Sequence, residues 1–166
     1  MNNSIVGNVQ ALPPIVGSSS WLHALSRYLL FVTVANLAWE ILQLPLYTIW
    51  TSADIGDIAF AVIHCTGGDL IIATCTLVLA LIFMGSPFWP QQHFYPVAAM
   101  TIGLGVAYTV FSEWLNIVVR QSWEYSEIMP VIPILDVGLS PFAQWIVIPL
   151  TALNWARRGG IGKNES

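Results

Sequence analysis

The stretch DIAFAVIHCTGGDLIIATCTLVLALIFM, residues 57–84, decides the fold class of this chain. After Asp57 it contains one acidic residue, Asp69, and no lysine or arginine. A helix needs about 20 mostly apolar residues to cross roughly 30 Å of hydrocarbon. We therefore predict that residues 57–84 form a membrane-spanning helix.

Three further stretches have the same character. They are residues 27–50, 95–119 and 140–156, with Ser140 as the expected N-cap of the last one. The connections between the stretches are short, which favours antiparallel neighbours. We predict an all-α integral membrane protein, an up-down bundle of four transmembrane helices. The transmembrane domain would cover residues 21–157, between a flexible N-terminal tail, 1–20, and a basic cytoplasmic C-terminal tail, 158–166.

The composition of the whole chain agrees with this class. Of its 166 residues, 56% are apolar and only 8% are charged, whereas soluble domains carry about 25% charged residues. The lipid bilayer is therefore the expected surrounding. The net charge of −4 and the small number of basic residues argue against nucleic acid as a partner. The absence of CxxC, P-loop and GxGxxG motifs leaves thiol oxidoreductases and nucleotide enzymes without support.

The basic residues predict the orientation. Arg27, Arg157, Arg158 and Lys163 flank the first and last stretches, whereas Arg120 alone lies on the opposite side. Loops rich in lysine and arginine remain in the cytoplasm. We expect a multi-pass protein of the cell membrane with both termini cytoplasmic.

Acidic residues inside the predicted spans indicate a functional site. Glu40, Asp69 and Glu113 lie there together with His64. Charge within the bilayer is costly, and such residues usually mark binding, catalysis or transport. We expect His64 and Glu113 to act as an acid–base pair, or as metal ligands if a metal is bound, with Glu40 and Asp69 stabilising charge. The sequence leaves the cofactor, and the choice between enzyme and binding protein, open.

Uncharged polar residues extend this site. Asn36, Glu40, Gln43 and Tyr47 follow i, i+4, i+7 and i+11 spacing, which places them on one helical face. Thr109, Glu113, Asn116 and Arg120 repeat that spacing in the third stretch. We expect the ligand-binding groups to be Asn36, Gln43, Tyr47, Asn116 and Gln144. Taken singly, the amides are equally typical of hydrogen bonds that only hold helices together.

The depth of these residues suggests a shared pocket. Counted from the outer ends of the stretches, Gln43, His64, Glu113 and Gln144 lie roughly 10 Å down, and Glu40 and Asp69 lie deeper. We expect a polar pocket that opens outward under a cap formed by residues 120–139. It would bind or chemically transform a small amphipathic or lipid-like molecule. One alternative is a proton- or cation-coupled transporter or sensor that uses the same carboxylates and would need a homo-oligomer for a full permeation path. The other alternative is an accessory subunit of a membrane complex.

Overall fold

The computed structural model describes residues 17–158, of which 77% are helical. Four long helices form the body: α1 (Gly17–Gln43), α3 (Ile55–Met84), α4 (Phe94–Trp114) and α5 (Leu139–Arg158). The short elements are the 3₁₀ helix η1 (Leu44–Leu46), α2 (Ile49–Ser52), the π-helix η2 (Leu115–Val119) and a hairpin of β1 (Val131–Ile132) and β2 (Val137–Gly138). Residues 1–16 and 159–166, which hold most of both predicted tails, lie outside the described residues.

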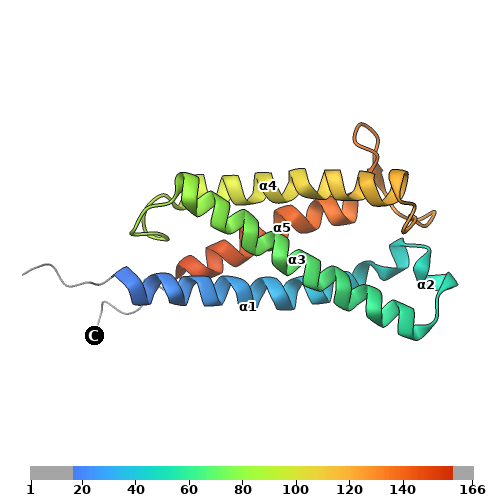
Figure 1. Ribbon diagram of the computed structural model, residues 1–166, viewed down its shortest axis with the longest axis horizontal. Helices are drawn as coiled ribbons and strands as arrows, with labels where there is room; N and C mark the ends of the chain where they lie inside the picture. Colours follow the sequence, from blue (N-terminus) through green and yellow to red (C-terminus); the bar gives the residue numbers. More distant parts are fainter. Residues whose placement is uncertain (1–16, 159–166) are drawn as a thin grey trace, which may run out of the picture.

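Each long helix packs against two others. Helix α1 contacts α3 and α5, and α4 contacts the same two helices (Figure 1). The start of α1, the α3–α4 connection and the end of α5 lie together at the left of the figure, and we call this the terminal end. The opposite end, formed by residues 44–54 and 115–138, is called the loop end. Each end thus gathers segments that are distant in the sequence.

Three segments are long and apolar enough to cross a membrane: Trp21–Leu46, Ile55–Met84 and Phe94–Val119. Many of their apolar side chains face outward, with Leu42 78% and Ile63 69% exposed. Such surfaces suit lipid rather than water. Helix α5 is not among the three, since its 20 residues include Gln144, Asn154 and two arginines. The membrane class expected from the sequence is thus supported by three helices, and the fourth span remains a prediction.

Helix α3 begins two residues before the predicted start of its span. The side chain of Asp54 accepts hydrogen bonds from the backbone N–H groups of Gly56 and Asp57, at 2.8 and 3.0 Å. This N-cap satisfies donors that have no partner within the helix. The polar turn between the first two long helices is therefore what starts α3.

Helix α1 is displaced from its predicted bounds at both ends. It already includes residues 17–20, which we expected in the tail, and it ends at Gln43 rather than Trp50. Pro45 lacks an N–H group and disfavours α geometry in the residue before it. The chain passes through η1 and reaches Tyr47 in an extended conformation, with φ −118° and ψ 148°. Tyr47 consequently does not continue the helical stripe of Asn36, Glu40 and Gln43.

The start of α5 also differs from expectation. The helix begins at Leu139, directly after β2, and the N–H group of Leu139 donates to the Pro130 carbonyl at 2.7 Å. Because the helix already includes Leu139, Ser140 lies in its first turn and is not the N-cap. Its hydroxyl group is free to bond elsewhere in the protein.

An apolar core fills the bundle toward the terminal end. Its fully buried side chains include Tyr28, Leu77, Val97 and Leu153. Helices α4 and α5 approach closely where the Trp145 ring lies over Gly105. A Cβ atom at position 105 would lie only 2.4 Å from Cε3 of Trp145. Gly105 therefore permits this helix contact.

We expect Gly105→Ala to destabilise the protein, because the new methyl group overlaps the Trp145 ring. Overpacking of this kind costs about 1–3 kcal/mol. Gly103→Ala is the matched control, since nothing lies within 4 Å of a Cβ atom there, and alanine improves helix propensity by about 1 kcal/mol. Thermal unfolding in detergent, followed by circular dichroism, should show a lower midpoint for Gly105→Ala only. Equal midpoints for the two variants would contradict the proposed contact.

Candidate functional site

The side-chain amide of Gln144 is the centre of a buried hydrogen-bond network. Its Nε2 atom lies 2.8 Å from Oδ1 of Asn36, 3.0 Å from Oδ2 of Asp69 and 3.1 Å from Oε1 of Glu40. Gln144 is only 2% exposed. An amide nitrogen carries two hydrogens, so three acceptors compete for them. This one side chain of α5 thereby joins α1 and α3.

A second set of bonds extends the network toward the loop end. Gln43 Nε2 donates to Glu40 Oε1 at 2.8 Å, and Ser140 Oγ donates to Gln43 Oε1 at 2.9 Å. Trp39 Nε1 completes the series by donating to Ser140 Oγ at 3.1 Å. We call Asn36, Trp39, Glu40, Gln43, Asp69, Ser140 and Gln144 the polar network. Its bonds link α1 and α5 over several helical turns.

The two carboxyl groups of the network are close neighbours. Both accept from the same amide nitrogen, Nε2 of Gln144, at 3.1 Å for Glu40 and 3.0 Å for Asp69. No lysine or arginine among residues 17–158 forms a salt bridge with either of them. Two acidic side chains thus share one neutral donor without a basic partner in the described part of the chain.

Glu113 is held by a different partner from the one we predicted. The hydroxyl group of Tyr125 donates to Oε2 of Glu113, and the backbone N–H of Gly138 donates to the same hydroxyl at 2.7 Å. The ring of Tyr125 packs against that of Tyr47, with centroids 5.6 Å apart. Burial, followed by the contact with Glu113, raises the pKa of Tyr125. The phenol thus remains a hydrogen-bond donor to Glu113.

Residues 120–138, which include Tyr125, form a segment that we call the capping loop. Hydrogen bonds attach it to the residues that follow α1. The N–H of Thr48 donates to the Glu124 carbonyl at 3.0 Å, and Ser126 bonds to Leu46 and Pro45 at 2.9 and 3.0 Å. These bonds place the capping loop against residues 45–48, at the loop end of the molecule (Figure 1). The hydroxyl group of Tyr125 thereby reaches Glu113.

Three buried donors near these groups lack a hydrogen-bond partner in the described part of the chain. They are the hydroxyl groups of Thr66 and Thr109 and the indole N–H of Trp123. Thr109 lies one helical turn before Glu113, and Thr66 lies one turn before Asp69. A buried polar group without a partner costs free energy. Unpaired donors beside carboxyl groups are therefore natural contacts for the oxygen atoms of a ligand.

The structure brings together most of the predicted site residues. Asn36, Glu40, Gln43, Asp69 and Gln144 meet in the polar network, while Glu113 and Tyr47 meet at Tyr125. None of these contacts tests the chemical roles that we assigned to the residues.

Two predicted site residues lie elsewhere. His64 is exposed on the outer surface of α3 and stacks on Phe60, with ring centroids 5.5 Å apart, so it does not pair with Glu113. Asn116 bonds only to Ser112 of its own segment, because η2 changes the helical register after Trp114. Within residues 17–158, no group of three or more His, Cys, Asp and Glu side chains is arranged to hold a metal ion.

Sequence reasoning missed Tyr125, Ser140 and Trp39. The register between α1 and α5 determines which side chains face each other. That register cannot be read from the spacing of residues within either helix. Tyr125 belongs to a loop and therefore follows no periodicity. The only available signal was the unusual content of aromatic residues and prolines in residues 120–139.

The polar network does not continue toward the terminal end. The buried hydroxyl groups of Thr76 and Thr101 bond to carbonyls of their own helices there, at 3.2 and 2.8 Å, and that of Tyr28 has no hydrogen-bond partner among the described residues. The surrounding side chains are apolar, and Trp145 and Ile148 follow Gln144 along α5. The site is thus closed on one side by the core.

Comparisons of the chain with family models, with curated proteins and with solved structures gave no match.

We expect Gln144→Leu to lower the free energy of unfolding by about 2 kcal/mol, because three buried oxygen atoms lose their shared donor. Asn116→Leu is the control, since Asn116 bonds only within its own segment, and it should cost less than about 0.5 kcal/mol. Unfolding by denaturant in mixed micelles provides the measurement. A Gln144→Leu protein as stable as the control would show that the network contributes little to folding.

We also expect Tyr125→Phe to loosen the capping loop, because it removes both the bond to Glu113 and the acceptor for Gly138. Hydrogen exchange measured by mass spectrometry should become at least about tenfold faster in residues 120–138, which corresponds to roughly 1.4 kcal/mol. Tyr108→Phe serves as the control, since Tyr108 is an exposed residue of α4. Unchanged exchange in Tyr125→Phe would rule out this hydroxyl as the fastening of the loop.

Proposed function

We propose that α1, α3, α4 and α5 all cross the cell membrane, as an up-down bundle with both termini in the cytoplasm. Three of these helices suit a membrane by length and composition, and α5 packs against two of them. The inward side chains of α5 explain its lower hydropathy, since Gln144 belongs to the polar network. Arg27, Arg157 and Arg158 lie toward the terminal end, which agrees with a cytoplasmic position.

We further propose that the polar network and Glu113 form a site that binds or chemically transforms a small amphipathic or lipid-like molecule. The observation that carries this proposal is three carboxyl groups on three helices without a basic partner in the described part of the chain. Glu40 and Asp69 accept from Gln144, and Glu113 accepts from Tyr125 of the capping loop. Such an arrangement is expensive in a bilayer and is usually retained for function. The lipid surroundings and the adjoining apolar core favour a ligand with an apolar part.

The unpaired donors indicate which groups the polar part of the ligand would carry. The hydroxyl groups of Thr66 and Thr109 and the indole of Trp123 are suited to oxygen acceptors such as hydroxyl or carbonyl groups. Glu40 and Asp69, which share the Gln144 donor, would exchange a proton with the ligand. Glu113 and Tyr125 would form a second acid–base pair, in place of the predicted pair of His64 and Glu113.

Transport of a proton or cation is the alternative that uses the same carboxylates. A permeation path needs polar groups across the whole membrane, either within one chain or in a homo-oligomer. The described residues provide them near the loop end, whereas the core toward the terminal end is apolar. This asymmetry favours a site that opens on one side.

The decisive experiment compares ligands that copurify with the protein in mild detergent. Native mass spectrometry and analysis of an organic extract should find a small amphipathic compound bound to the wild type, to Glu113→Gln or to both proteins. This variant keeps an acceptor for Tyr125 but removes the carboxyl group. If Glu113 takes part in chemistry, the variant should accumulate the unreacted compound, at about tenfold or greater occupancy relative to the wild type. Glu127→Gln, in an exposed part of the capping loop, is the matched control.

The result that would overturn the proposal is equally clear. No retained compound on either protein, together with proton or cation flux in liposomes that is lost in Glu40→Gln, would establish the transport alternative. A folded protein with neither compound nor flux, isolated with a partner subunit, would support the accessory role.

A further inference from the structure

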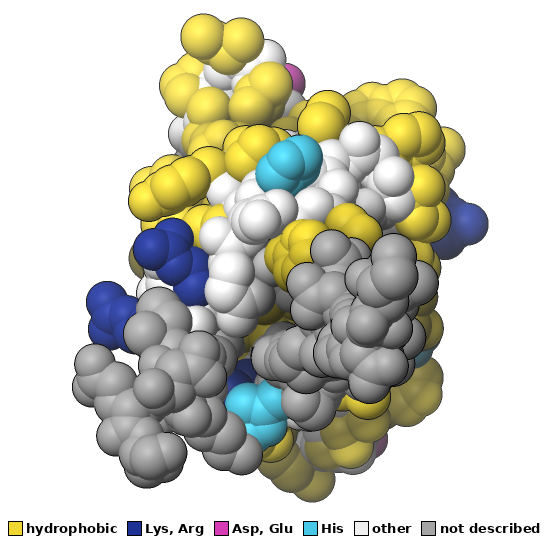
Figure 2. Space-filling model, turned by 90° about the vertical axis from the view of Figure 1, so that its left-hand side faces the viewer, with side chains coloured by type: hydrophobic (Ala, Val, Ile, Leu, Met, Phe, Trp, Pro, Cys, Tyr) yellow, Lys and Arg dark blue, Asp and Glu magenta, His cyan; other side chains and the backbone are white. Residues whose placement is uncertain are grey.

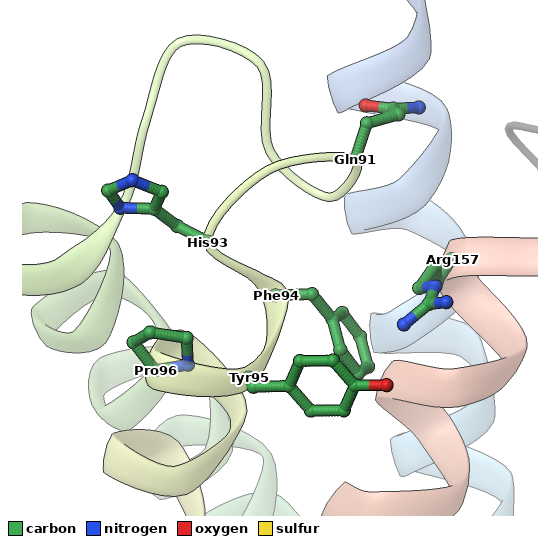
Figure 3. A pocket seen from close by; sticks show the side chains of 6 residues that line it. All are labelled: Gln91, His93, Phe94, Tyr95, Pro96 and Arg157. Carbon is green, nitrogen blue, oxygen red and sulfur yellow. The ribbon is translucent and has the colours of Figure 1, made fainter.

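A pocket lies at the terminal end, remote from the polar network. Its volume is about 500 Å³, and it is lined by Gln91, His93, Phe94, Tyr95, Pro96 and Arg157. Gln91 and His93 come from the α3–α4 connection, the next three residues begin α4, and Arg157 belongs to the last turn of α5 (Figure 3). Pockets of about 300–1,000 Å³ are typical of small-molecule sites.

Arg157 is the charged group of this pocket. Its guanidinium carbon lies 4.8 Å from the ring centre of Phe94 and 5.8 Å from that of Tyr95. The side chain points toward these rings (Figure 3). Within residues 17–158 no acidic side chain forms a salt bridge with Arg157. The aromatic rings therefore hold the guanidinium group in place, and no acidic side chain of residues 17–158 neutralises its charge.

The neighbouring arginine on α1 behaves differently. Arg27 donates to the Trp155 carbonyl at 3.0 Å, and its guanidinium group stacks on the Trp155 ring at 4.0 Å. Arg27 is thus engaged with the backbone of α5. Arg157 forms no hydrogen bond with the described residues and its guanidinium group lies against aromatic rings there, so its donors remain available to a ligand.

The surface around the pocket carries positive charge. Every acidic residue among residues 17–158 lies in the polar network, at the loop end or in the helical turn next to that end: Glu40, Asp54, Asp57, Asp69, Glu113, Glu124, Glu127 and Asp136. Figure 2 looks onto the terminal end, where blue arginine and cyan histidine side chains reach the surface between yellow hydrophobic groups. The pocket therefore attracts an anion.

The pocket also lies where an apolar span begins. Phe94 is the first residue of both α4 and the apolar segment Phe94–Val119. The aromatic side chain of Tyr95 is 73% exposed, and that of Phe88 is 61% exposed. Aromatic residues of this kind collect at the level of lipid headgroups. An anion that arrives with an apolar tail would find suitable surroundings on both sides.

We propose that this pocket binds the phosphate group of an anionic lipid headgroup, with Arg157 as its main contact. A guanidinium group donates two parallel hydrogen bonds to phosphate oxygens. The amide of Gln91 and the hydroxyl of Tyr95 provide further donors at the pocket wall. Anionic lipids are abundant in the cytoplasmic leaflet, which is the side proposed for this end. The inference is independent of the ligand at the polar network.

Native mass spectrometry of the full chain with added phosphatidylglycerol or phosphatidylcholine tests the proposal. We expect tighter retention of phosphatidylglycerol by the wild type, and about tenfold weaker retention by Arg157→Gln, which loses the charge-assisted bonds. Arg157→Lys should restore part of the difference, since it keeps the charge but not the planar donors. Arg158→Gln is the matched control, because that arginine does not line the pocket.

Several outcomes would overturn the inference. Equal losses in Arg157→Gln and Arg158→Gln would mean diffuse attraction by the surface. Arg157-dependent binding of inorganic phosphate that matches binding of the lipid would assign the pocket to free phosphate instead. If Arg157→Gln does not fold, Gln91→Ala in the exposed connection gives the second test, and an unchanged lipid preference there would count against the pocket.

Discussion

The structure depends on the three contacts of one amide group. Gln144 donates to oxygen atoms of Asn36, Glu40 and Asp69, and thereby fixes α5 against α1 and α3. Hydrophobic burial cannot specify such a register within lipid, because lipid tails are as apolar as the helix surfaces. Polar groups that must find partners within the protein can specify it. The same bonds that hold these helices together also place the carboxyl groups of the candidate site.

The two ends of the molecule differ in the chemistry of their side chains. Polar side chains gather toward the loop end, where the capping loop supplies the Tyr125 hydroxyl group to Glu113. Toward the terminal end, apolar packing replaces them, and the close contact of Gly105 with Trp145 brings α4 and α5 together. Arginines dominate the terminal end, whereas the acidic loop residues lie at the other. This contrast is the basis of the two sites that we propose, one for a buried polar ligand and one for an anionic lipid headgroup.

Much of the candidate site could be predicted from the sequence, because acids are conspicuous in apolar segments. Helical spacing placed Asn36, Glu40 and Gln43 on one face, and the structure joins all three to the network. Spacing failed where the helix itself changes. Pro45 ends the α-helical geometry before Tyr47, and η2 alters the register before Asn116. The prediction for His64 failed for another reason, since one helix alone does not reveal which face meets its neighbours.

The sequence by itself determined the membrane character of the chain and its helical class, because apolar segments of this length are stable as helices in lipid. It also determined which residues are too polar to face hydrocarbon. Only the tertiary structure decided their partners: Glu113 meets Tyr125 rather than His64, and Gln144 serves three acceptors at once. The physical reason is that a hydrogen bond between helices depends on their mutual register and rotation. Both are set by packing between segments that are as much as 128 positions apart in the chain.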